Sequence, residues 1–503
     1  MEKNNRTNAG RSASPNLGDL KVYLKRGKEE SLLRFHPWVF SGAIHHADRG
    51  ISEGDVVRVV NADGAFIAIG HYQGGSIAVR VLTFSDVCID DAFWQTRLRS
   101  ALNMRIAIGL VGRASKRDAA ERLEAFTTME RLEAFPTTER SEAFTTTERL
   151  EAFPTTERLE AFPTTERLEA FPTTERLEAF TATERLEAFT TTERSEAFTA
   201  TERLEAFPTN AYRLVHGEGD HLPGLIIDIY GETAVMQAHS IGMHRARHAI
   251  ASALMTVMDG RLGSVYYKSE STLSFVEPES GFIIGGTDEN IAVENGLHFY
   301  VDWLKGQKTG FFVDQRENRA LLERYAAGRR VLNMFCYTGG FSFYAMRGGA
   351  QLVHSVDSSA KAVELTRRNV ELNFPGDARH HAFCEDAFRF LDNLECTQPS
   401  YDLIILDPPA FAKHRGALHN ALKGYTRLNN KAFEKIAQGG ILFTFSCSQV
   451  VTKDHFRNAV FTAAAQAGRK VRILHQLHQP ADHPINIYHP EGEYLKGLVL
   501  YVE

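Results

Sequence analysis

The chain has 503 residues, a formal net charge of -6 and 24% charged residues. This length predicts several domains and is ample for a buried core. Five cysteines are too few for a disulfide framework, no apolar run reaches the roughly 20 residues of a membrane span, and the N-terminus has no hydrophobic signal core. We therefore expect a cytoplasmic protein without a membrane partner, in which residues 1–19 form a disordered tail.

Short apolar stretches between residues 21 and 85 predict the strands of a small β-barrel. They read KVYL, VVRVVN, AFIAIG and SIAVRVLTF, with turns at Asp63-Gly64 and Gly74-Gly75. A basic cluster precedes Trp38, and an aromatic ring is available there for stacking on a base. The candidate RNA contacts of this segment are Lys25, Arg26, Arg34 and Trp38. A solvated basic face beside a core tryptophan is the alternative interpretation.

Ten copies of a nonapeptide close to ERLEAFPTT occupy residues 121–210. They carry a net charge of -10 and leave +4 for the rest of the chain, so the overall acidity is no argument against a nucleic-acid partner. Nine residues advance a helix by about 900°, so the phenylalanines would alternate between faces, and prolines recur through the block. We interpret it as a mostly disordered insertion without a catalytic role, with a spacer or partner-binding arm as the alternative.

Residues 211–300 show a mixed α/β pattern. Strands are expected within 212–230 and at 234–238, and a helix at 244–258. We expect the histidines of this segment and of the C-terminus to lie on the surface rather than to bind a metal. They are His239, His244, His248, His475, His478, His483 and His489.

From about residue 328 onward, strand and helix patterns alternate along the chain. Strands are expected at residues 330–335, 352–357, 381–386, 401–406, 440–445, 470–476 and 498–502. Helices are expected between them at residues 341–346, 360–372 and 422–436. This alternation predicts an α/β fold with a parallel sheet and helices on both faces.

The carboxyl ends of these strands carry the residues with chemical potential. In such sheets ligands bind beyond the carboxyl ends of the strands. The residues at these ends are Thr338-Gly339-Gly340, Asp357, Asp386, Asp407-Pro408-Pro409 and Cys447. Asp357 lies 17 residues after Gly340, about where an acid binds ribose hydroxyls in nucleoside-binding sheets. The turn lacks G-x-G-x-x-G spacing, which favours a nucleoside cofactor such as S-adenosylmethionine over a dinucleotide.

Cys447 stands between two serines at a strand end. A thiolate that adds to C6 of a pyrimidine makes C5 nucleophilic enough to accept a methyl group, so this cysteine is a candidate for covalent catalysis. An inert buried cysteine is the alternative, and that is our interpretation of Cys88, Cys384 and Cys396. No two cysteines have C-x-x-C spacing, so we expect no metal site.

Several stretches resemble the ribosomal RNA large subunit methyltransferase I family, S-adenosylmethionine-dependent 5-methylcytosine enzymes with an N-terminal PUA domain. They are RGKEESLLRFHPWVFSGAI (26–44), GEGDHLPGLIIDIYG (217–231), GQKTGFFVDQREN (306–318), NMFCYTGGFS (333–342), LDPPAF (406–411), TFSCS (444–448) and HPEGEYLKG (489–497). The implied parts are a PUA-like β-barrel (20–95), a helical connector (96–120), the repeat insertion (121–210), a mixed α/β middle domain (211–300) and a Rossmann-like seven-stranded methyltransferase sheet (301–503).

The resemblance also implies roles for single residues. The cofactor would contact Phe311, Gln315, Asn333, Phe335, Tyr337, Thr338, Gly339, Gly340, Asp357, Asp386, Asp407 and Pro408. Asp357 would hold the ribose and Asp386 the adenine amino group. Cys447 would be the nucleophile, Asp407 would contact cytosine N3, and Arg316 would position RNA. Many RNA 5-methylcytosine enzymes carry a second cysteine near this Asp-Pro-Pro motif that assists product release, and this chain continues with Ala410 instead.

The function implied is methylation of C5 of a specific cytosine in large-subunit ribosomal RNA, with S-adenosylmethionine as cofactor. Two alternatives remain open from the residues. One is methylation of a base amino group by the Asp-Pro-Pro site, which needs no thiolate. The other is an RNA-binding ribosome assembly factor that has lost catalysis. The sequence leaves open which cytosine is modified and whether the chain forms a homodimer.

Overall fold

The computed structural model describes residues 20–112, 209–269, 273, 280–287, 290–394 and 401–503. These residues all belong to one of the chain's two units. The expected N-terminal tail and nearly all of the repeat block lie outside them. No described helix is long and apolar enough to cross a membrane.

The first sheet has six strands in the order β2-β6-β5-β4-β1-β3. Its elements are β1 (Lys21–Leu24), α1 (Glu30–Leu33), β2 (Trp38–Phe40), η1 (Ser41–Ala43), β3 (Ile44–Ala47), β4 (Val56–Val60), β5 (Phe66–Tyr72) and β6 (Ile77–Thr83). Inward-facing valines and leucines of these strands form its core. The four predicted strands are confirmed. The sequence pattern missed β2 and β3 because they are short and carry no clear alternation of apolar and polar residues.

A second sheet has the order β11-β10-β9-β8-β7, in which only the β9–β10 pair is parallel among the described strands. Its elements are α2 (Asp91–Ala107), β7 (Ala211–His216), η2 (Gly217–Asp220), β8 (Leu225–Tyr230), β9 (Thr233–Ala238), α7 (Ile241–Arg245), α8 (Arg247–Met258), β10 (Ser264–Lys268) and β11 (Ser280–Ile284). Helices α2 and α8 share one hydrophobic core with this sheet. Helix α2, which overlaps the expected connector, therefore packs against this sheet.

A hairpin of β12 (Ile291–Glu294) and β13 (Leu297–Tyr300) leads into the last sheet. Its turn residues Asn295 and Gly296 both have positive φ, the conformation for which Asn-Gly turns are favoured. The Tyr300 amide donates to Asn369 Oδ1 over 2.8 Å, so the hairpin is tied to the helix that carries Asn369.

The C-terminal sheet has seven strands in the order β16-β15-β14-β17-β18-β20-β19, which confirms the predicted Rossmann-like architecture. Its elements are η3 (Val313–Gln315), α9 (Arg316–Glu323), β14 (Arg330–Met334), α10 (Gly340–Arg347), β15 (Leu352–Asp357), α11 (Ala360–Asn373), β16 (His380–Cys384), α12 (Ala387–Asn393), β17 (Tyr401–Leu406), η4 (Arg415–Ala417), α13 (Leu418–Lys435), β18 (Ile436–Ser446), α14 (Lys453–Gln466), β19 (Val471–Leu477), η5 (Pro490–Gly492) and β20 (Lys496–Val502). The expectation of a fully parallel sheet is wrong at one strand. β20 returns antiparallel between β18 and β19.

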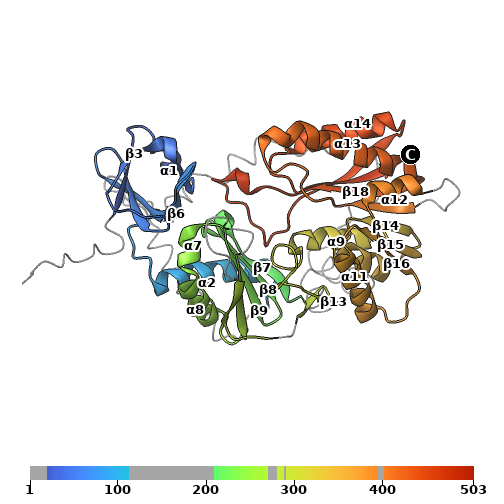
Figure 1. Cartoon of the computed structure of the whole chain (residues 1–503), viewed down its shortest axis with the longest axis horizontal. Coiled ribbons are helices and arrows are strands. Elements are labelled where there is room, and N and C mark those ends of the chain that lie inside the picture. Colours follow the sequence, from blue (N-terminus) through green and yellow to red (C-terminus); the bar gives the residue numbers. More distant parts are fainter. Residues whose placement is uncertain (1–19, 113–208, 270–272, 274–279, 288–289, 395–400) are drawn as a thin grey trace, which may run out of the picture. The chain divides into compact units, whose positions relative to one another are not determined.

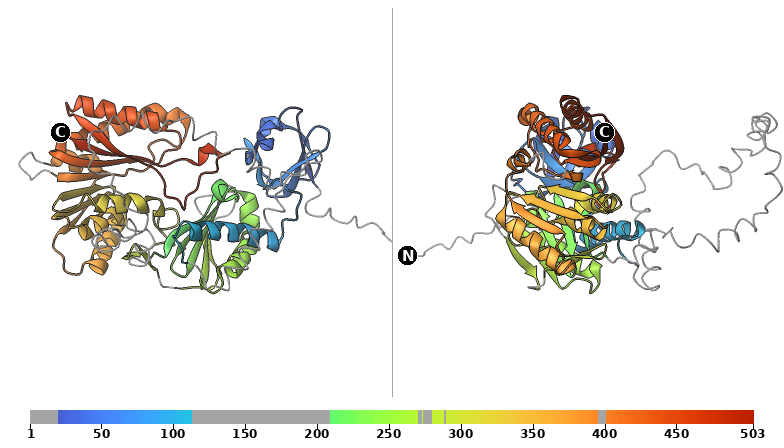
Figure 2. Two further views of the ribbon diagram at one scale, coloured as in Figure 1. Left: turned by 180° about the vertical axis from the view of Figure 1, so that it is seen from behind. Right: turned by 90° about the vertical axis from the view of Figure 1, so that its right-hand side faces the viewer.

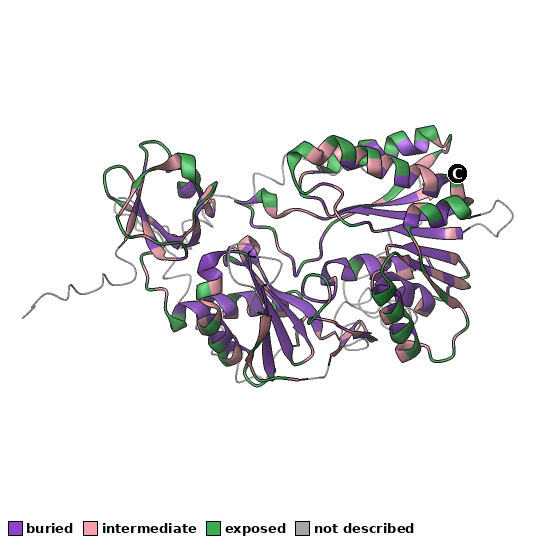
Figure 3. Cartoon of the chain, in the orientation of Figure 1, coloured by how far each residue is buried: buried purple, intermediate pink, exposed green. Residues whose placement is uncertain are grey.

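Helices cover both faces of this sheet, with α13 and α14 on one face and α9 and α11 on the other (Figures 1 and 2). The central strands are buried along their length, whereas the outer faces of the helices are exposed (Figure 3). Strands buried on both faces read as continuous apolar runs, such as Leu403–Leu406 and Ile441–Phe443. The sheet is therefore a rigid base that holds the residues following each strand.

Candidate functional site

Strand register brings the predicted site residues to one edge of the C-terminal sheet. Met334 pairs with Val356 on one side and with Leu406 on the other, and Leu406 pairs with Thr444. The residues just beyond these positions are the turn after β14, Asp357, Asp407 and Cys447. The shared edge expected from the sequence is thus present.

The turn after β14 has a constrained backbone. Phe335, Tyr337 and Gly339 have φ angles of 58°, 48° and 87°, a region that side chains other than glycine rarely adopt. A Cβ on Gly339 would lie 2.6 Å from the Phe343 ring and 2.7 Å from Thr366 Cγ2. Glycine is therefore required at position 339 both by the backbone conformation and by the packing of Phe343 and Thr366.

Asn333, just before this turn, is buried with one polar atom unsatisfied. Its Nδ2 donates to Ser342 Oγ over 2.9 Å, while Oδ1 has no hydrogen-bond partner among the described residues. A buried amide oxygen without a partner is costly unless a ligand donates to it. Thr338 and Gly340 complete the turn, and Gly340 begins α10. Asn333 Oδ1 is thus a candidate ligand contact.

Asp357 and Asp386 occupy different environments. Asp357 Oδ2 accepts from the Tyr337 amide over 3.0 Å and Oδ1 accepts from the Ser359 amide over 2.9 Å, so its carboxylate is fixed against the turn. Asp386 is exposed and caps α12, with Oδ1 accepting from the amides of Phe388 and Arg389. Both of these hydrogen bonds go to Oδ1, and neither uses Oδ2 of Asp386.

Asp407 is held by two successive side-chain hydrogen bonds that involve Gln315, just before α9, and Asn318. Gln315 Nε2 donates to Asp407 Oδ2 over 3.1 Å, and Asn318 Nδ2 donates to Gln315 Oε1 over 2.6 Å. Burial and the charge of Asp314 raise the pKa of Asp407 to about 7, against the lowering effect of the Gln315 hydrogen bond. The neighbouring Pro408 is buried. Asp407 can therefore carry a proton near neutral pH.

Cys447 is partly buried just beyond β18, and both flanking serines are anchored. Ser446 Oγ donates to the hydroxyl of Tyr425 over 2.9 Å, and Ser448 Oγ donates to the Ala412 carbonyl over 2.5 Å. Burial raises the pKa of the Cys447 thiol, the nearby Lys308 ammonium lowers it, and Asp407 raises it further. The thiolate thus depends on nearby positive charge.

Two lysines that the sequence did not single out lie near this cysteine. Lys496 is 5% exposed and its Nζ donates to the Ser448 carbonyl over 2.6 Å. Burial lowers the pKa of Lys496 to about 8, and the charge on Cys447 opposes that change. Lys308 Nζ lies 3.5 Å from Asp314 Oδ2 and 4.6 Å from the centre of the Phe312 ring. Both lysines fall in stretches that carry the family resemblance, although nothing in the sequence pattern indicated their proximity.

Two residues expected at the cofactor or the RNA are buried for structural reasons. Phe311 packs in the core against Phe299, with ring centres 4.6 Å apart, and under the Arg319 guanidinium. Arg316 is 3% exposed and pairs with Asp482 over 3.0 Å between Nη1 and Oδ2. Its guanidinium is therefore not on the surface, where a phosphate could reach it.

The other candidate RNA contacts lie at or near the surface of the first sheet. Lys25 and Arg34 are exposed, and Arg26 forms an exposed ion pair with Asp63. Trp38 is half-buried and donates from Nε1 to Glu218 Oε1 over 2.9 Å. The tryptophan is thus neither a core residue nor a free surface ring.

The expectation that the C-terminal histidines lie on the surface is wrong for His483 and His489, which are 1% and 3% exposed. His483 Nδ1 lies 3.1 Å from Asp482 Oδ1, and Asp482 also accepts from the Arg213 amide. Part of the loop between β19 and β20 therefore packs into the interior, although Ile487 in the same loop is 84% exposed. Among the described residues, no group of three or more histidine, cysteine or acidic residues could hold a metal ion.

Comparison with known proteins places this geometry in a family. Residues 265–491 match the model for S-adenosylmethionine-dependent methyltransferases, and residues 22–84 match that for PUA-like domains. The chain is 34% identical to the ribosomal RNA large subunit methyltransferase I of Tolumonas auensis and 32% identical to that of Aeromonas hydrophila, in each case over 95% of this chain and 98% of the relative. The chain belongs to this family. It is an S-adenosylmethionine-dependent methyltransferase with an N-terminal PUA-like domain.

Solved structures agree with the fold. A Streptococcus mutans protein assigned to the SAM-dependent methyltransferases superposes with a TM-score of 0.66 at 19% identity, over 96% of this chain and all of that one. A methyltransferase-class structure complexed with SAH gives a TM-score of 0.67 with the same coverage and identity. At this identity the likeness shows the shared fold alone.

The residues at the sheet edge fit S-adenosylmethionine, the methyl donor of this family. Asn333 Oδ1 lacks a hydrogen-bond partner among the described residues, and Asp357 presents a fixed carboxylate beside the turn. A carboxylate at the end of the second strand suits the hydroxyls of a ribose.

Proposed function

We propose that this enzyme methylates C5 of a specific cytosine in large-subunit ribosomal RNA through a covalent bond between Cys447 and the base. The names of the relatives above support the substrate class. The observation that carries the proposed reaction is the position of Cys447, which follows β18 at the same sheet edge as Asp407 and the cofactor turn.

The proposed reaction begins when Cys447 Sγ, as a thiolate, attacks C6 of the cytosine. The S–C6 bond forms and the electron pair of the C5–C6 double bond becomes available at C5. S-adenosylmethionine, when bound, would supply a methyl group on a positively charged sulfur. The C5–CH3 bond would form as the S–CH3 bond breaks, and S-adenosylhomocysteine would leave. A base then removes the C5 proton, the C5–C6 double bond re-forms and the S–C6 bond breaks, which returns the thiolate.

Asp407 is suited to assist the addition step. Attack at C6 increases the electron density on the ring, and a proton donor at N3 stabilises that charge. With a pKa of about 7, Asp407 can hold the necessary proton at neutral pH, and Gln315 fixes its orientation by the 3.1 Å hydrogen bond. We therefore assign Asp407 to cytosine N3, in keeping with its expected role.

Positive charge near Cys447 supports its role as a nucleophile. Burial alone favours the neutral thiol, so the thiolate needs compensation. Lys308 supplies part of it, and Lys496, anchored on the carbonyl of the residue after Cys447, lies next to the same segment. The second cysteine of many related RNA enzymes is absent here, so product release does not use one.

The proposal is tested by mapping modified nucleotides by mass spectrometry in ribosomal RNA from cells that lack the gene. One 5-methylcytosine of the large subunit should disappear, and the wild-type gene should restore it. Cys447→Ala should not restore it, whereas Cys88→Ala should do so. The expectation of a buried cysteine is wrong for Cys88 and Cys384, which are both exposed, and Cys88 lies outside the proposed site. If the set of modified nucleotides is the same with and without the gene, the proposal that large-subunit ribosomal RNA is the substrate is wrong. A fully active Cys447→Ala variant contradicts the covalent adduct and favours methylation of a base amino group.

A further inference from the structure

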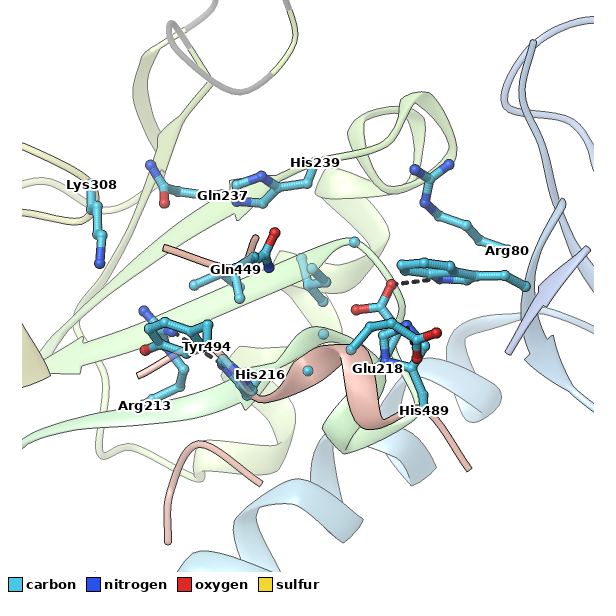
Figure 4. Close-up of a pocket in the computed structure, with 17 residues that line it drawn as sticks. Arg80, Arg213, His216, Glu218, Gln237, His239, Lys308, Gln449, His489 and Tyr494 are labelled. Atoms are coloured by element: carbon cyan, nitrogen blue, oxygen red, sulfur yellow. Dashed lines mark hydrogen bonds and ion pairs between the residues drawn. The ribbon is translucent and has the colours of Figure 1, made fainter. Parts of the chain in front are cut away.

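A pocket of about 390 Å³ lies beside the proposed active site. This volume falls within the range of about 300–1,000 Å³ typical of ligand pockets. Its lining residues come from the first sheet, the second sheet and the C-terminal segment, and the side chains converge on a common space (Figure 4). The residues that matter for its chemistry are Trp38, Arg80, Glu218, Lys308, Gln449 and His489.

One end of the pocket is an anchored aromatic pair. Trp38 Nε1 donates to Glu218 Oε1 over 2.9 Å, and the His489 ring lies 4.2 Å from the tryptophan ring between centres, at a steep angle of 68°. The hydrogen bond fixes the indole, which lines the pocket, to Glu218, and Glu218 lies beside His489 in Figure 4. A fixed aromatic ring at a pocket wall is a surface on which a planar base can stack.

His489 has polar atoms that no described residue satisfies. It is 3% exposed, and neither ring nitrogen has a hydrogen-bond partner among the described residues. Its Nε2 lies 3.7 Å from Glu491 Oε2, beyond hydrogen-bond range. Burial lowers its pKa, so the ring is neutral near pH 7 and offers one donor and one acceptor. A buried imidazole that lines a pocket in this state points to a polar ligand.

Cationic groups lie at both ends of the pocket. Arg80 is half-buried and donates to the neutral Gln73 Oε1 over 3.0 Å, and the described residues give it no ion pair. Arg213, by contrast, is neutralised by its two hydrogen bonds to Asp228. Lys308 stands at the opposite end from Arg80 and Glu218 and is half exposed (Figure 4). Arg80 is therefore available for a phosphate, whereas the ammonium of Lys308 is shared with Asp314 Oδ2, 3.5 Å away, and adds positive charge at its end of the pocket.

The pocket adjoins the nucleophile. Lys308 lines it and acts electrostatically on Cys447, and Gln449, which also lines it, is only two residues further along the chain. A chain of nucleotides whose cytosine reaches Cys447 would pass this opening.

We propose that the pocket takes one unpaired nucleotide of the RNA strand next to the target cytosine, with its base against Trp38 and His489 and its phosphates near Arg80 and Lys308. This inference rests on the proposed function for the identity of the strand. Proteins read single-stranded RNA by splaying out bases and stacking them on aromatic rings, which is the chemistry this pocket offers.

The test measures binding of short single-stranded RNA to the full chain by fluorescence anisotropy. The probes are fluorescein-labelled nonamers with a central cytidine and random flanks, and a matched series with one abasic residue at each flanking position. Trp38→Ala should weaken binding of the intact nonamer by about 5- to 150-fold, the equivalent of one base–aromatic stack. Trp38→Phe should keep most of the affinity. Phe461→Ala, which changes a 71% exposed ring on α14, should have no effect.

The abasic series locates the stacked base. At one flanking position the abasic residue should weaken binding to the wild type, and the same change should cost nothing further in Trp38→Ala, because both remove one contact. Additive losses at every position, or unchanged binding by Trp38→Ala, would overturn the proposal. Far-ultraviolet circular dichroism and thermal unfolding of each variant show whether it is folded.

Tryptophan fluorescence gives a second readout. The chain has three tryptophans, and Trp94 and Trp303 are 3% and 4% exposed, so Trp38 should respond most to a bound base. The RNA nonamer should quench the emission, and the quenching should be absent in Trp38→Phe. If cytidine monophosphate saturates the same signal at lower concentration than the nonamer, the pocket takes a free nucleotide and the proposal is wrong. Binding needs no methyl transfer, so its result is independent of whether 5-methylcytosine forms.

Discussion

Gln315 Nε2 donates to Asp407 Oδ2 over 3.1 Å, and this bond links the segment before α9 to the carboxyl that follows β17. The amide stabilises the charged form of Asp407, whereas burial and the charge of Asp314 stabilise the neutral form. Burial and the charge of Asp314 have the larger effect, so the pKa of Asp407 is about 7. A single residue at the sheet edge therefore couples the state of the site to pH.

Replacing Asp407 with Asn should change how stability depends on pH. The pKa of about 7 in the folded chain exceeds the ordinary 3.8, so between these values the folded chain holds a proton that the unfolded chain has lost. The resulting stabilisation is complete below pH 4 and disappears as the pH rises through 7, and it amounts to at most about 4 kcal/mol. The thermal midpoint should fall more between pH 5 and pH 8 in the wild type than in Asp407→Asn. Parallel curves would contradict the raised pKa.

Lys496→Met should make the Cys447 thiol less reactive. The ammonium is held by the Ser448 carbonyl and favours the thiolate, so its loss should raise the thiol pKa and slow alkylation by iodoacetamide at pH 7.5. The alkylated site is identified by mass spectrometry of the cysteine peptide. Lys470→Met changes an exposed lysine before β19 and serves as the control. An equal alkylation rate at Cys447 in both variants would show that Lys496 does not act on the thiol.

The sequence predicted those site residues that lie at the end of a parallel strand or in the turn after it. Asp357 and Asp407 come directly after apolar runs, and parallel strands bring such ends to one edge. Lys496 reaches the same edge from an antiparallel strand, where it pairs with Ser446. If β20 were parallel to its neighbours, as the sequence pattern predicts, its first residue, Lys496, would lie at the opposite edge of the sheet. Lys496 was therefore missed.

Contacts between distant segments were also beyond prediction. Asp482 lies in a loop without periodicity, yet it accepts from the Arg213 amide, 269 residues earlier, and from Arg316. Only the folded loop between β19 and β20 creates this cluster, which also buries His483 and His489. The histidines of this loop were therefore expected on the surface, whereas the pairing of Asp482 with Arg316 makes burial of the charged cluster beside them tolerable.

Asp357→Asn should weaken cofactor binding. Both carboxylate oxygens accept backbone amides from Tyr337 and Ser359, which fixes the group beside the turn. Hydrogen bonds to a charged group contribute about 1.5–3 kcal/mol, so the Kd for S-adenosylhomocysteine should rise by about 10- to 150-fold. Isothermal titration calorimetry measures this change. Asp377→Asn, in the loop before β16, is the control, and an equal Kd for the two variants would remove Asp357 from the cofactor site.

Arg316 and Arg34 should separate stability from RNA binding. Arg316 is buried against Asp482, so Arg316→Ala removes the guanidinium that balances a buried carboxylate and should cost about 3–5 kcal/mol, seen as a marked fall in the thermal midpoint. Arg34 is exposed beside Trp38's sheet, and Arg34→Ala should leave the midpoint unchanged. It should instead weaken binding of the RNA nonamer and reduce the slope of log affinity against log salt by about 1, because one phosphate contact is lost. The reverse pattern, with a stable Arg316→Ala that loses one unit of salt slope, would return Arg316 to the RNA surface expected from the sequence.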